Sequence, residues 1–332
     1  MRQLSSPADL QDYDRWVKEH PEGTLWQSLE WKAYQEALGR EVRIYADEVE
    51  SGKWKVESSA LVIIDRTTFG LNTWDIPRGP LGQAEHLLKK IIEQAKSEKC
   101  LSLFNSPLDT TFHFPLSTFL SPRTEQPPAT RLIDLQQGEE AILSQMKQKG
   151  RYNIRVAEKH GVQIRQSDDI DAFARLAAET ARRDGFTAPP AARYRKFLES
   201  LPGAFLLLAY PTPYAQRPTP PIAGLLGTQW NGTGIYYYGA SDYEYRNLMA
   251  PYLLQWEAMK LCKARGCHTY DLLGISRPTT HDSPSTTHDS WSGITRFKEQ
   301  FGGTVVEYAP EQQILLKPWA NKVLQWKRYI LG

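Results

Sequence analysis

The chain has almost no net charge and no long apolar run. Its 332 residues carry 40 Lys and Arg against 38 Asp and Glu, a formal charge of +2. This balance excludes a strongly basic chain, so any anion-binding surface must come from local clustering. No apolar stretch approaches the roughly 20 residues that span a bilayer, and the N-terminus lacks an apolar signal core. We expect a cytoplasmic protein without a transmembrane segment, and peripheral membrane contact stays open.

Cysteine is scarce as well. Cys100, Cys262 and Cys267 are odd in number and have no metal-ligand spacing, so we interpret them as reduced thiols. No Gly-x-Ser-x-Gly elbow occurs, and no cysteine has a recognisable nucleophile setting. Covalent catalysis therefore has little support.

A short repeat, Thr-Thr-His-Asp-Ser, occurs twice between residues 279 and 290. Its His281, Asp282, His288 and Asp289 are residue types that bind metals or transfer protons. The segment is rich in Ser, Thr and Pro and has neither helical nor strand periodicity. We therefore expect a loop or a mobile lid and no metal site.

The order of predicted elements is similar in the two halves of the chain. Helices are predicted over residues 7–20 and 28–38, strands over 42–46, 54–64 and 74–81, a helix over 84–99 and a strand over 101–104. After a proline-bearing linker at 121–129, helices at 170–183 and 191–201 precede strands at 204–209, 222–230 and 234–238, and a proline-rich loop at 211–221 interrupts these. A chain of this length has room for two domains. We predict an α/β fold with two copies of one module.

The last part of the second copy, residues 235–275, reads as strand, loop, helix and strand. Tyr236, Tyr237 and Tyr238 favour a strand, the helix is predicted to begin near Ala250, and residues 270–275 form the next buried strand. A β–α–β unit opens its ligand crevice where the first strand ends and the helix begins. We expect the chemistry of this half near that point.

Positive charge concentrates between Met146 and Gly161. The cations are Lys147, Lys149, Arg151, Arg155 and Lys159. Arg151, Arg155 and Lys159 are spaced four apart, which places them on one helical face. Such a stripe suits a polyphosphate or an RNA backbone. An ordinary solvated helix face explains the charge pattern about equally well.

A second motif surrounds Lys298. Phe297 and Phe301 are four apart and give a short helix an inward face that ends at Gly302. Beside a buried aromatic ring, the field of a lysine is strengthened by desolvation, and such a lysine can stabilise an oxyanion during acyl transfer. Spacing alone favours an ordinary surface lysine.

Two α/β modules of this order resemble the acetyltransferase-like fold, in which coenzyme A pyrophosphate rests on a glycine-rich helix start. The corresponding stretch here is Arg246-Asn-Leu-Met249-Ala-Pro251. Both glycine positions are lost, and bulkier residues obstruct close approach of the backbone to phosphates. Coenzyme A is therefore a poor candidate donor, and we expect no cofactor.

Taken in order along the chain, six segments resemble the Fem family of peptidyltransferases, which move an amino acid from aminoacyl-tRNA to a peptidoglycan precursor. They are Gln27-Ser-Leu-Glu-Trp31, Pro77-Arg-Gly-Pro-Leu81, the cationic segment 147–161, Tyr238-Gly-Ala-Ser241 with Ala250-Pro-Tyr252-Leu-Leu-Gln255, Tyr270-Asp271-Leu-Leu-Gly-Ile275, and Gly293-Ile-Thr-Arg-Phe297-Lys298-Glu-Gln-Phe301-Gly302. Each is weak alone, and their order makes the resemblance specific.

The resemblance implies two tandem acetyltransferase-like (GNAT) domains with a C-terminal helix, residues 319–330, packing back on the first. It assigns residues 1–130 and 311–332 to a domain on the precursor side, and 131–310 to a domain on the aminoacyl-tRNA side. It also implies that the precursor site lies in the first domain and in a cleft shared with the second.

The resemblance matches Lys298, after Phe297, to a lysine thought to stabilise charge at the reacting carbonyl. It matches the helix from Trp31 to Gln35 and the segment near Arg193 to regions that hold the precursor. Further candidate substrate-binding residues within the shared segments are Arg78, Tyr238, Ser241 and Tyr252. The chain departs from the family pattern at Gln35, Ser106 and Arg193, which bears on the substrate more than on the reaction class.

We therefore expect an aminoacyltransferase in which a stem-peptide amine attacks the ester of aminoacyl-tRNA. The acceptor would be a UDP-linked muropeptide or lipid II, and the product an interpeptide bridge of the cell wall. Lys298 would stabilise the oxyanion, and Asp271 would orient a group or accept a proton. The alternatives are an N-acyltransferase that uses acyl coenzyme A and a non-catalytic RNA-binding module.

Overall fold

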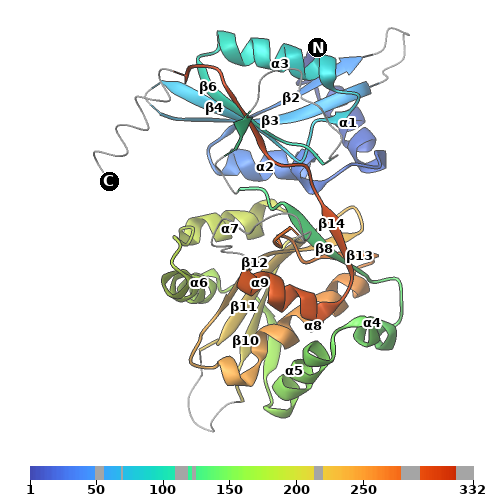
Figure 1. Cartoon of the computed structure of the whole chain (residues 1–332), viewed down its shortest axis with the longest axis vertical. Helices are drawn as coiled ribbons and strands as arrows, with labels where there is room; N and C mark the ends of the chain where they lie inside the picture. Colours follow the sequence, from blue (N-terminus) through green and yellow to red (C-terminus); the bar gives the residue numbers. More distant parts are fainter. Residues whose placement is uncertain are drawn as a thin grey trace, which may run out of the picture. The chain divides into compact units, whose positions relative to one another are not determined.

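The computed structural model describes residues 1–48, 56–68, 70–108, 119–121, 125–212, 220–277 and 292–318 (Figure 1). It divides into two compact units, the first from the described residues of Met1–Pro128 and Tyr308–Gly332, the second from those of Ala129–Glu307. The expected C-terminal helix at 319–330 and the repeat at 279–290 lie outside the described residues, as do residues 213–219 of the expected proline-rich loop.

The first unit is built on an eight-stranded sheet with the order β1-β2-β3-β4-β6-β15-β7, in which β5 pairs with β3. Its elements are β1 (Arg2–Leu4), α1 (Pro7–Glu19), η1 (Leu25–Gln27), α2 (Leu29–Ala37), β2 (Glu41–Glu48), β3 (Val56–Thr68), β4 (Leu71–Pro77), β5 (Leu81–Gly82), α3 (Glu85–Ser97), β6 (Cys100–Ser106), β7 (Phe119–Leu120) and β15 (Gln312–Leu315).

The second unit is built on a seven-stranded sheet with the order β14-β8-β13-β12-β11-β10-β9. Its elements are β8 (Ala129–Asp134), α4 (Glu139–Gln145), α5 (Gln148–Lys159), β9 (Gln163–Ser167), α6 (Ile170–Asp184), α7 (Ala191–Ser200), β10 (Phe205–Tyr210), β11 (Ala223–Trp230), β12 (Thr233–Ser241), η2 (Arg246–Leu248), α8 (Ala250–Ala264), β13 (Thr269–Asp271), α9 (Ser292–Lys298), η3 (Glu299–Phe301) and β14 (Thr304–Glu307).

The two units share one succession of elements. The run α1-α2-β2-β3-β4-α3-β6 of the first unit corresponds to α6-α7-β10-β11-β12-α8-β13 of the second. In each, an antiparallel meander ends in a helix that leads to a parallel strand, β4 with β6 and β12 with β13. The predicted α/β class, with two copies of one module, is confirmed.

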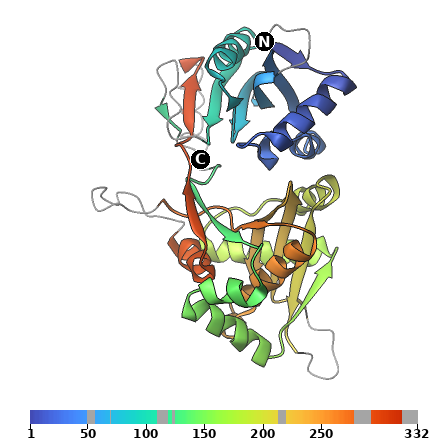
Figure 2. The same ribbon diagram turned by 90° about the vertical axis from the view of Figure 1, so that its right-hand side faces the viewer.

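Strand β10 explains why helices cover both faces of the second sheet. Its sequence, Phe-Leu-Leu-Leu-Ala-Tyr, is apolar almost throughout, as expected for a strand buried on both sides. Phe205 and Leu207 belong to the core formed with α5 and α8, which lie side by side (Figures 1 and 2). The opposite face meets α6, where Phe173 packs against Gly224 of the neighbouring strand. A polar substitution in β10 therefore has no solvated face to occupy.

In the first unit, the buried amide of Gln27 ties η1 to the sheet. Its Nε2 donates to the carbonyl of Pro77 at 2.7 Å, and its Oε1 accepts from the backbone N–H of Leu61 at 2.8 Å. The Tyr13 hydroxyl donates to the Gln27 carbonyl. Gln27 thus satisfies buried backbone groups of two strands.

All three cysteines are free and buried. Among the helices that the structure describes, none combines the length and the apolar character needed to cross a bilayer.

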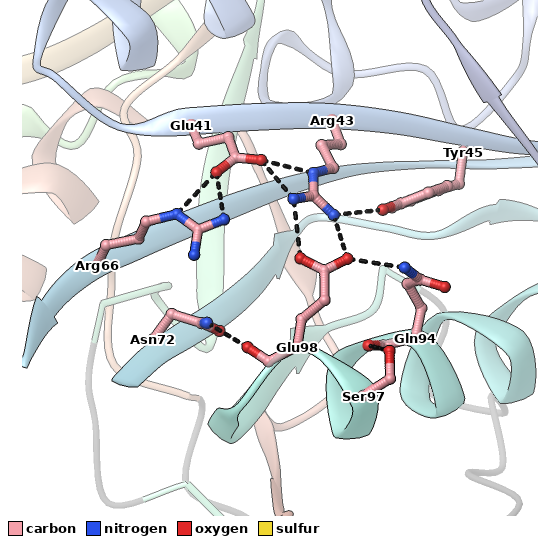
Figure 3. Close-up of polar contacts among 8 residues, drawn as sticks. All are labelled: Glu41, Arg43, Tyr45, Arg66, Asn72, Gln94, Ser97 and Glu98. Atoms are coloured by element: carbon pink, nitrogen blue, oxygen red, sulfur yellow. Dashed lines mark hydrogen bonds and ion pairs between the residues drawn. The ribbon is translucent and has the colours of Figure 1, made fainter. Parts of the chain in front are cut away.

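An ion-pair network joins the end of α3 to the sheet of the first unit (Figure 3). Arg43 donates to both carboxylate oxygens of Glu98, at 2.6 and 2.9 Å, and its guanidinium lies 5.5 Å from the centre of the Trp74 ring. Glu41 bridges Arg43 and Arg66. The hydrogen bonds from Arg43 lower the pKa of Glu98. Because both side chains are partly buried and the pair is bidentate, the pair contributes more than an exposed ion pair does.

Replacing Glu98 by Gln should lower the free energy of unfolding at pH 7 by about 1–2 kcal/mol, because Arg43 loses a charged partner. A carboxyl whose pKa is lowered on folding stabilises the protein above its unfolded pKa, and that contribution is lost as pH falls below it. The deficit relative to wild type should therefore shrink below about pH 4.5. Urea unfolding followed by tryptophan fluorescence measures it.

Glu85→Gln, on the same helix, is the matched control. Glu85 pairs with Lys89 at an exposed i,i+4 position, so its loss should leave stability nearly unchanged. Equal effects of the two substitutions would contradict the assignment.

Candidate functional site

The parallel strands β12 and β13 separate in the second unit, and the candidate site lies at this opening. They pair at only three positions, from Thr233 with Thr269 to Ile235 with Asp271. In the first unit, β4 and β6 pair at six positions, from Asn72 with Cys100 to Pro77 with Ser106. Strand β12 continues to Ser241 beyond its last described pair with β13. The predicted location of the crevice, where the first strand ends and the helix begins, agrees with this geometry.

The opening arises because β13 ends at Asp271. The prediction of a strand over 270–275 was therefore wrong beyond Asp271. Leu273 has φ +51° and Gly274 has φ +24°, values that extended strands do not adopt. Asp271 holds this turn, since its Oδ1 accepts from the backbone N–H of Leu273 at 2.7 Å and from the hydroxyl of Thr130 on β8.

The turn binds the amine of Lys298. Lys298 is 5% exposed, and its Nζ donates to the carbonyls of Leu273 at 2.5 Å and Gly274 at 2.7 Å. The Nζ also lies 5.4 Å from the centre of the Tyr236 ring. Desolvation lowers the pKa of Lys298 to about 7, and the charge of Asp271 opposes this shift. Near neutral pH the amine is therefore poised between its charged and neutral forms.

Three aromatic rings pack together at Phe297, the residue before Lys298. The Phe297 ring lies 5.0 Å from that of Tyr252 and 5.2 Å from that of Phe301, both in edge-to-face geometry. The predicted inward face of Phe297 and Phe301 is confirmed, because Phe301 is fully buried and both pack on the core of the second unit.

The chain after Phe301 must turn sharply. Gly302 and Gly303 have φ of +75° and +78°, and a Cβ at Gly302 would lie 2.4 Å from the carbonyl oxygen of Gln145. Arg131 donates to the carbonyls of both glycines, at 3.0 and 3.1 Å. This turn fixes the end of the helix that carries Lys298.

Two cavities adjoin Phe297. The first, which we call the α8 cavity, has about 170 Å³ and lies at the start of α8, against Met249, Pro251 and Tyr252. The second, the β12 cavity, has about 200 Å³ and lies against the end of β12 and the helices α6, α8 and α9. Ser241, Pro251 and Phe297 line both, so the cavities are neighbours. Of the catalytic candidates, Phe297 lines both cavities, whereas Lys298 and Asp271 line neither. The Lys298 amine lies 5.4 Å from the ring centre of Tyr236, which lines the β12 cavity.

Tyr236 was not among the predicted site residues. It lines the β12 cavity, and desolvation raises its pKa to about 12. A Cβ at position 239 would lie 1.8 Å from its hydroxyl oxygen, so Gly239 allows this packing. The three consecutive tyrosines predict a strand, but they do not indicate which ring faces the core.

A β-bulge determines which of these tyrosine rings faces the core. Gly227 pairs with Tyr236 and Leu226 with Tyr238, so Tyr237 is the extra residue of β12. Without the bulge, Tyr236 and Tyr238 would lie on the same face of the sheet, and the extra residue places them on opposite faces. Tyr236 faces Lys298, whereas the predicted substrate-binding residue Tyr238 packs against Tyr194 of α7, with ring centres 5.0 Å apart.

Of the other predicted substrate-binding residues, the structure brings Ser241 and Tyr252 to the cavities. Arg193 is half-buried on α7 and does not line either of them within the described part of the chain.

Three more predicted substrate-binding residues are buried in the first unit. The Trp31 ring packs against that of Tyr34, 5.2 Å away, and Gln35 accepts from Arg40 at 2.7 Å. Arg78, 2% exposed, donates to the carbonyl of Pro127 at 2.7 Å and lies 3.7 Å from the centre of the Tyr308 ring. In the structure described, these three hold the interior of their own unit.

The five predicted phosphate-binding cations do not all face solvent in the same way. Lys147 pairs with Glu299 at 2.9 Å, and Arg151 donates to the carbonyls of Ser144 and Met146. Lys149, Arg155 and Lys159 are exposed. Tyr152, 63% exposed, also lies on the outer side of α5, away from the buried Asn153, Ile154 and Ala157. The exposed face thus carries Tyr152 with three cations, Lys149, Arg155 and Lys159, and the predicted stripe does not extend through Arg151.

The described residues contain no group of three or more His, Cys, Asp or Glu side chains arranged to hold a metal ion.

The fold and the opened β12–β13 pair define a class, the tandem acetyltransferase-like proteins. A solved tandem GNAT protein from the clavulanic acid pathway matches with a TM-score of 0.58 at 12% identity, over 95% of this chain and 98% of that one. The structure of FemX matches with a TM-score of 0.76 at 20% identity, over 97% and 100%. The predicted GNAT-like tandem architecture is confirmed.

Within that class, the chain belongs to the FemAB family, whose sequence profile matches residues 9–119, 83–211 and 212–326. The chain is also similar to a lipid II:glycine glycyltransferase of Staphylococcus haemolyticus (strain JCSC1435), with 22% identity over 92% of this chain and 91% of the relative. The predicted family membership is confirmed.

Proposed function

We propose that the protein is an aminoacyltransferase that adds an amino acid to the stem-peptide amine of a peptidoglycan precursor, and so builds the interpeptide bridge of the cell wall. The observation that carries the proposal is the buried amine of Lys298, which follows Phe297, a residue that lines two cavities at an opened strand pair. Membership of the FemAB family and the similarity to a lipid II:glycine glycyltransferase support it.

In this proposal the donor is aminoacyl-tRNA and the acceptor is lipid II or its UDP-linked precursor. The exposed face of α5 supports an RNA donor, because Arg155 and Lys159 follow the exposed Tyr152 on one side of the helix, as in surfaces that combine phosphate contacts with base stacking. Use of this donor would place the reaction in the cytoplasm.

Coenzyme A fits the α8 cavity poorly as a donor. The side chains of Met249 and Pro251 line this cavity at the start of α8. Met249 has φ +53°, a conformation that a glycine adopts without strain. Pro251 removes one of the backbone N–H groups that would otherwise bind an anion at the helix start.

The reaction is the aminolysis of an ester. The acceptor nitrogen forms a bond to the carbonyl carbon, the carbonyl π electrons move to oxygen, and the resulting oxyanion collapses to expel the ribose oxygen. The nitrogen loses a proton and the ribose oxygen gains one. In its charged form Lys298 would stabilise the oxyanion. Two of its three N–H donors bind the carbonyls of Leu273 and Gly274, so the third would donate to the reacting oxygen.

Asp271 acts in this proposal as a positioning residue. Its carboxylate is occupied by Thr130 and by the N–H of Leu273, so it holds the turn whose carbonyls bind Lys298. Phe297 would exclude water from the ester. Roles in substrate binding for Trp31, Gln35, Arg78, Arg193 and Tyr238 stay predictions, and Ser241 and Tyr252 are the candidates that line the cavities.

Replacing Lys298 by Met should lower kcat for transfer by about 100- to 1000-fold, the usual cost of removing one donor to an oxyanion. Methionine keeps the unbranched apolar stem and removes the amine, so most of the buried volume should stay filled. The measurement is single-turnover transfer of radiolabelled amino acid from tRNA to the acceptor.

Lys263→Met is the matched control, because the Nζ of Lys263 also donates to two backbone carbonyls, those of Leu135 and Gln137. It should transfer at nearly the wild-type rate. If Lys298→Met keeps the wild-type melting temperature and also the wild-type kcat, this lysine does not stabilise the oxyanion.

Replacing both Arg155 and Lys159 by Ala should weaken binding of uncharged tRNA and reduce the slope of log K against log salt by about 1.5, since each phosphate contact contributes roughly 0.7–0.9. Fluorescence anisotropy between 50 and 200 mM salt measures the slope. The control pair is Lys89→Ala with Lys96→Ala, two exposed cations on α3. An unchanged slope in the α5 variant, or the same change in both, would show that this face does not bind the RNA.

A further inference from the structure

Tyr243 is an exposed aromatic residue that two arginines flank. Its side chain is 57% exposed, and it lies in the loop after β12. The Arg246 guanidinium lies 4.3 Å from the centre of its ring, and that of Arg183, at the end of α6, lies 5.6 Å from it. We name Tyr243, Arg183 and Arg246 the tyrosine–arginine cluster.

Hydrogen bonds fix both guanidinium groups. Arg183 donates to both carboxylate oxygens of Asp184, at 2.7 and 2.8 Å, and to the carbonyl of Ser241 at 3.3 Å. Arg246 donates to the carbonyl of Tyr243 itself at 3.1 Å. A ligand would therefore meet planar groups that are already oriented, and less conformational entropy would be lost on binding.

The tyrosine–arginine cluster lies at the rim of both cavities. Tyr243 and Arg246 line the α8 cavity, and Arg183 lines the β12 cavity. Phe297, the neighbour of Lys298, lines both. The cavities would thus connect a flat group bound at the cluster with Phe297, the residue before Lys298.

The charge around the cluster excludes a site for a run of phosphates. Asp184, Asp242 and Glu244 lie in the same two segments, so the arginines do not create a strongly positive surface. Asp184 is paired with Arg183, and Asp242 accepts from the N–H of Glu244 at 2.8 Å. A planar, neutral, π-electron-rich ligand is the better partner, because both tyrosine rings and guanidinium planes stack on such groups.

A nucleobase has these properties. Stacking of a base on an aromatic side chain tolerates any sequence, and arginine adds a cation–π contribution. Carboxylates close to such a stack accept hydrogen bonds from exocyclic amines or ribose hydroxyls.

We propose that the tyrosine–arginine cluster binds the terminal nucleoside of the RNA donor, which sets the ester of that nucleoside toward Phe297 and Lys298. This inference rests on the proposed function, since it assumes an RNA-linked amino acid. It assigns the end of the RNA to the cluster and leaves its phosphates to the exposed face of α5.

The test uses full-length protein and two acceptor-stem RNA hairpins, one with the complete single-stranded 3′ end and one that lacks only the terminal adenosine. Wild type should bind the complete hairpin about 5- to 150-fold more tightly than the shortened one, the usual range for one stacked base. Tyr243→Ala should bind both hairpins equally, and as weakly as wild type binds the shortened one.

Tyr243→Phe is the matched variant, because it keeps the ring and removes only the hydroxyl. It should still distinguish the two hairpins. Arg246→Gln should reduce the difference in affinity without abolishing it. Tyr243 is exposed, so the melting temperatures of its variants should equal that of wild type.

Two outcomes would overturn the inference and leave the proposed function standing. In the first, wild type transfers the amino acid, but Tyr243→Ala distinguishes the hairpins as well as wild type does. In the second, Tyr243→Ala loses the same factor on both hairpins, which would mean that Tyr243 contacts another part of the RNA. Failure of wild type to bind either hairpin or to transfer from aminoacyl-tRNA would overturn both proposals.

Discussion

The hydrogen bonds from the Lys298 amine to two adjacent backbone carbonyls are the interaction on which the site depends. A buried amine without partners would cost several kcal/mol. Here the carbonyls of Leu273 and Gly274 satisfy it, at 2.5 and 2.7 Å. Those carbonyls point inward because the chain leaves the sheet after Asp271 in a left-handed conformation. The burial that makes the partners necessary also lowers the pKa of the amine to about 7.

The same fold therefore occurs twice in the chain, once with a closed pair of parallel strands and once with an opened pair. In the first unit the parallel pair β4–β6 stays closed over six positions, and the strands have no opening of this kind over their described length. In the second unit the corresponding pair β12–β13 stops after three, and two cavities border the end of β12 and the start of α8. The difference comes from a few backbone angles in residues 271–274, not from a different order of elements. We infer that the second unit carries the reacting groups.

The sequence predicts the elements well, because long helices and apolar strands have clear periodicity and clear stops. It predicts Phe297 and Phe301 as an inward pair for the same reason. It does not reveal that Tyr236 and Tyr238 face opposite sides of the sheet, because a single extra residue at Tyr237 reverses the alternation. A β-bulge cannot be recognised from a sequence of three consecutive tyrosines.

Charge patterns are also ambiguous in the sequence. Helical spacing places Arg151 with Arg155 and Lys159, yet Arg151 binds the carbonyls of the preceding turn. Arg78 is an arginine in a motif of glycine and proline, and the structure buries it against Tyr308, more than two hundred residues further along the chain. Such long-range contacts are absent from any local pattern.

The most direct test of the account is the titration of the Lys298 amine itself. Nitrogen-detected NMR of protein labelled at lysine, with the resonance assigned from Lys298→Met, reports the protonation of each amine as pH changes. We expect this resonance to titrate with a pKa near 7, because the amine is desolvated at the turn. A pKa near 10.5, the ordinary value for lysine, would mean that burial does not destabilise the charged amine, and it would contradict a poised Lys298.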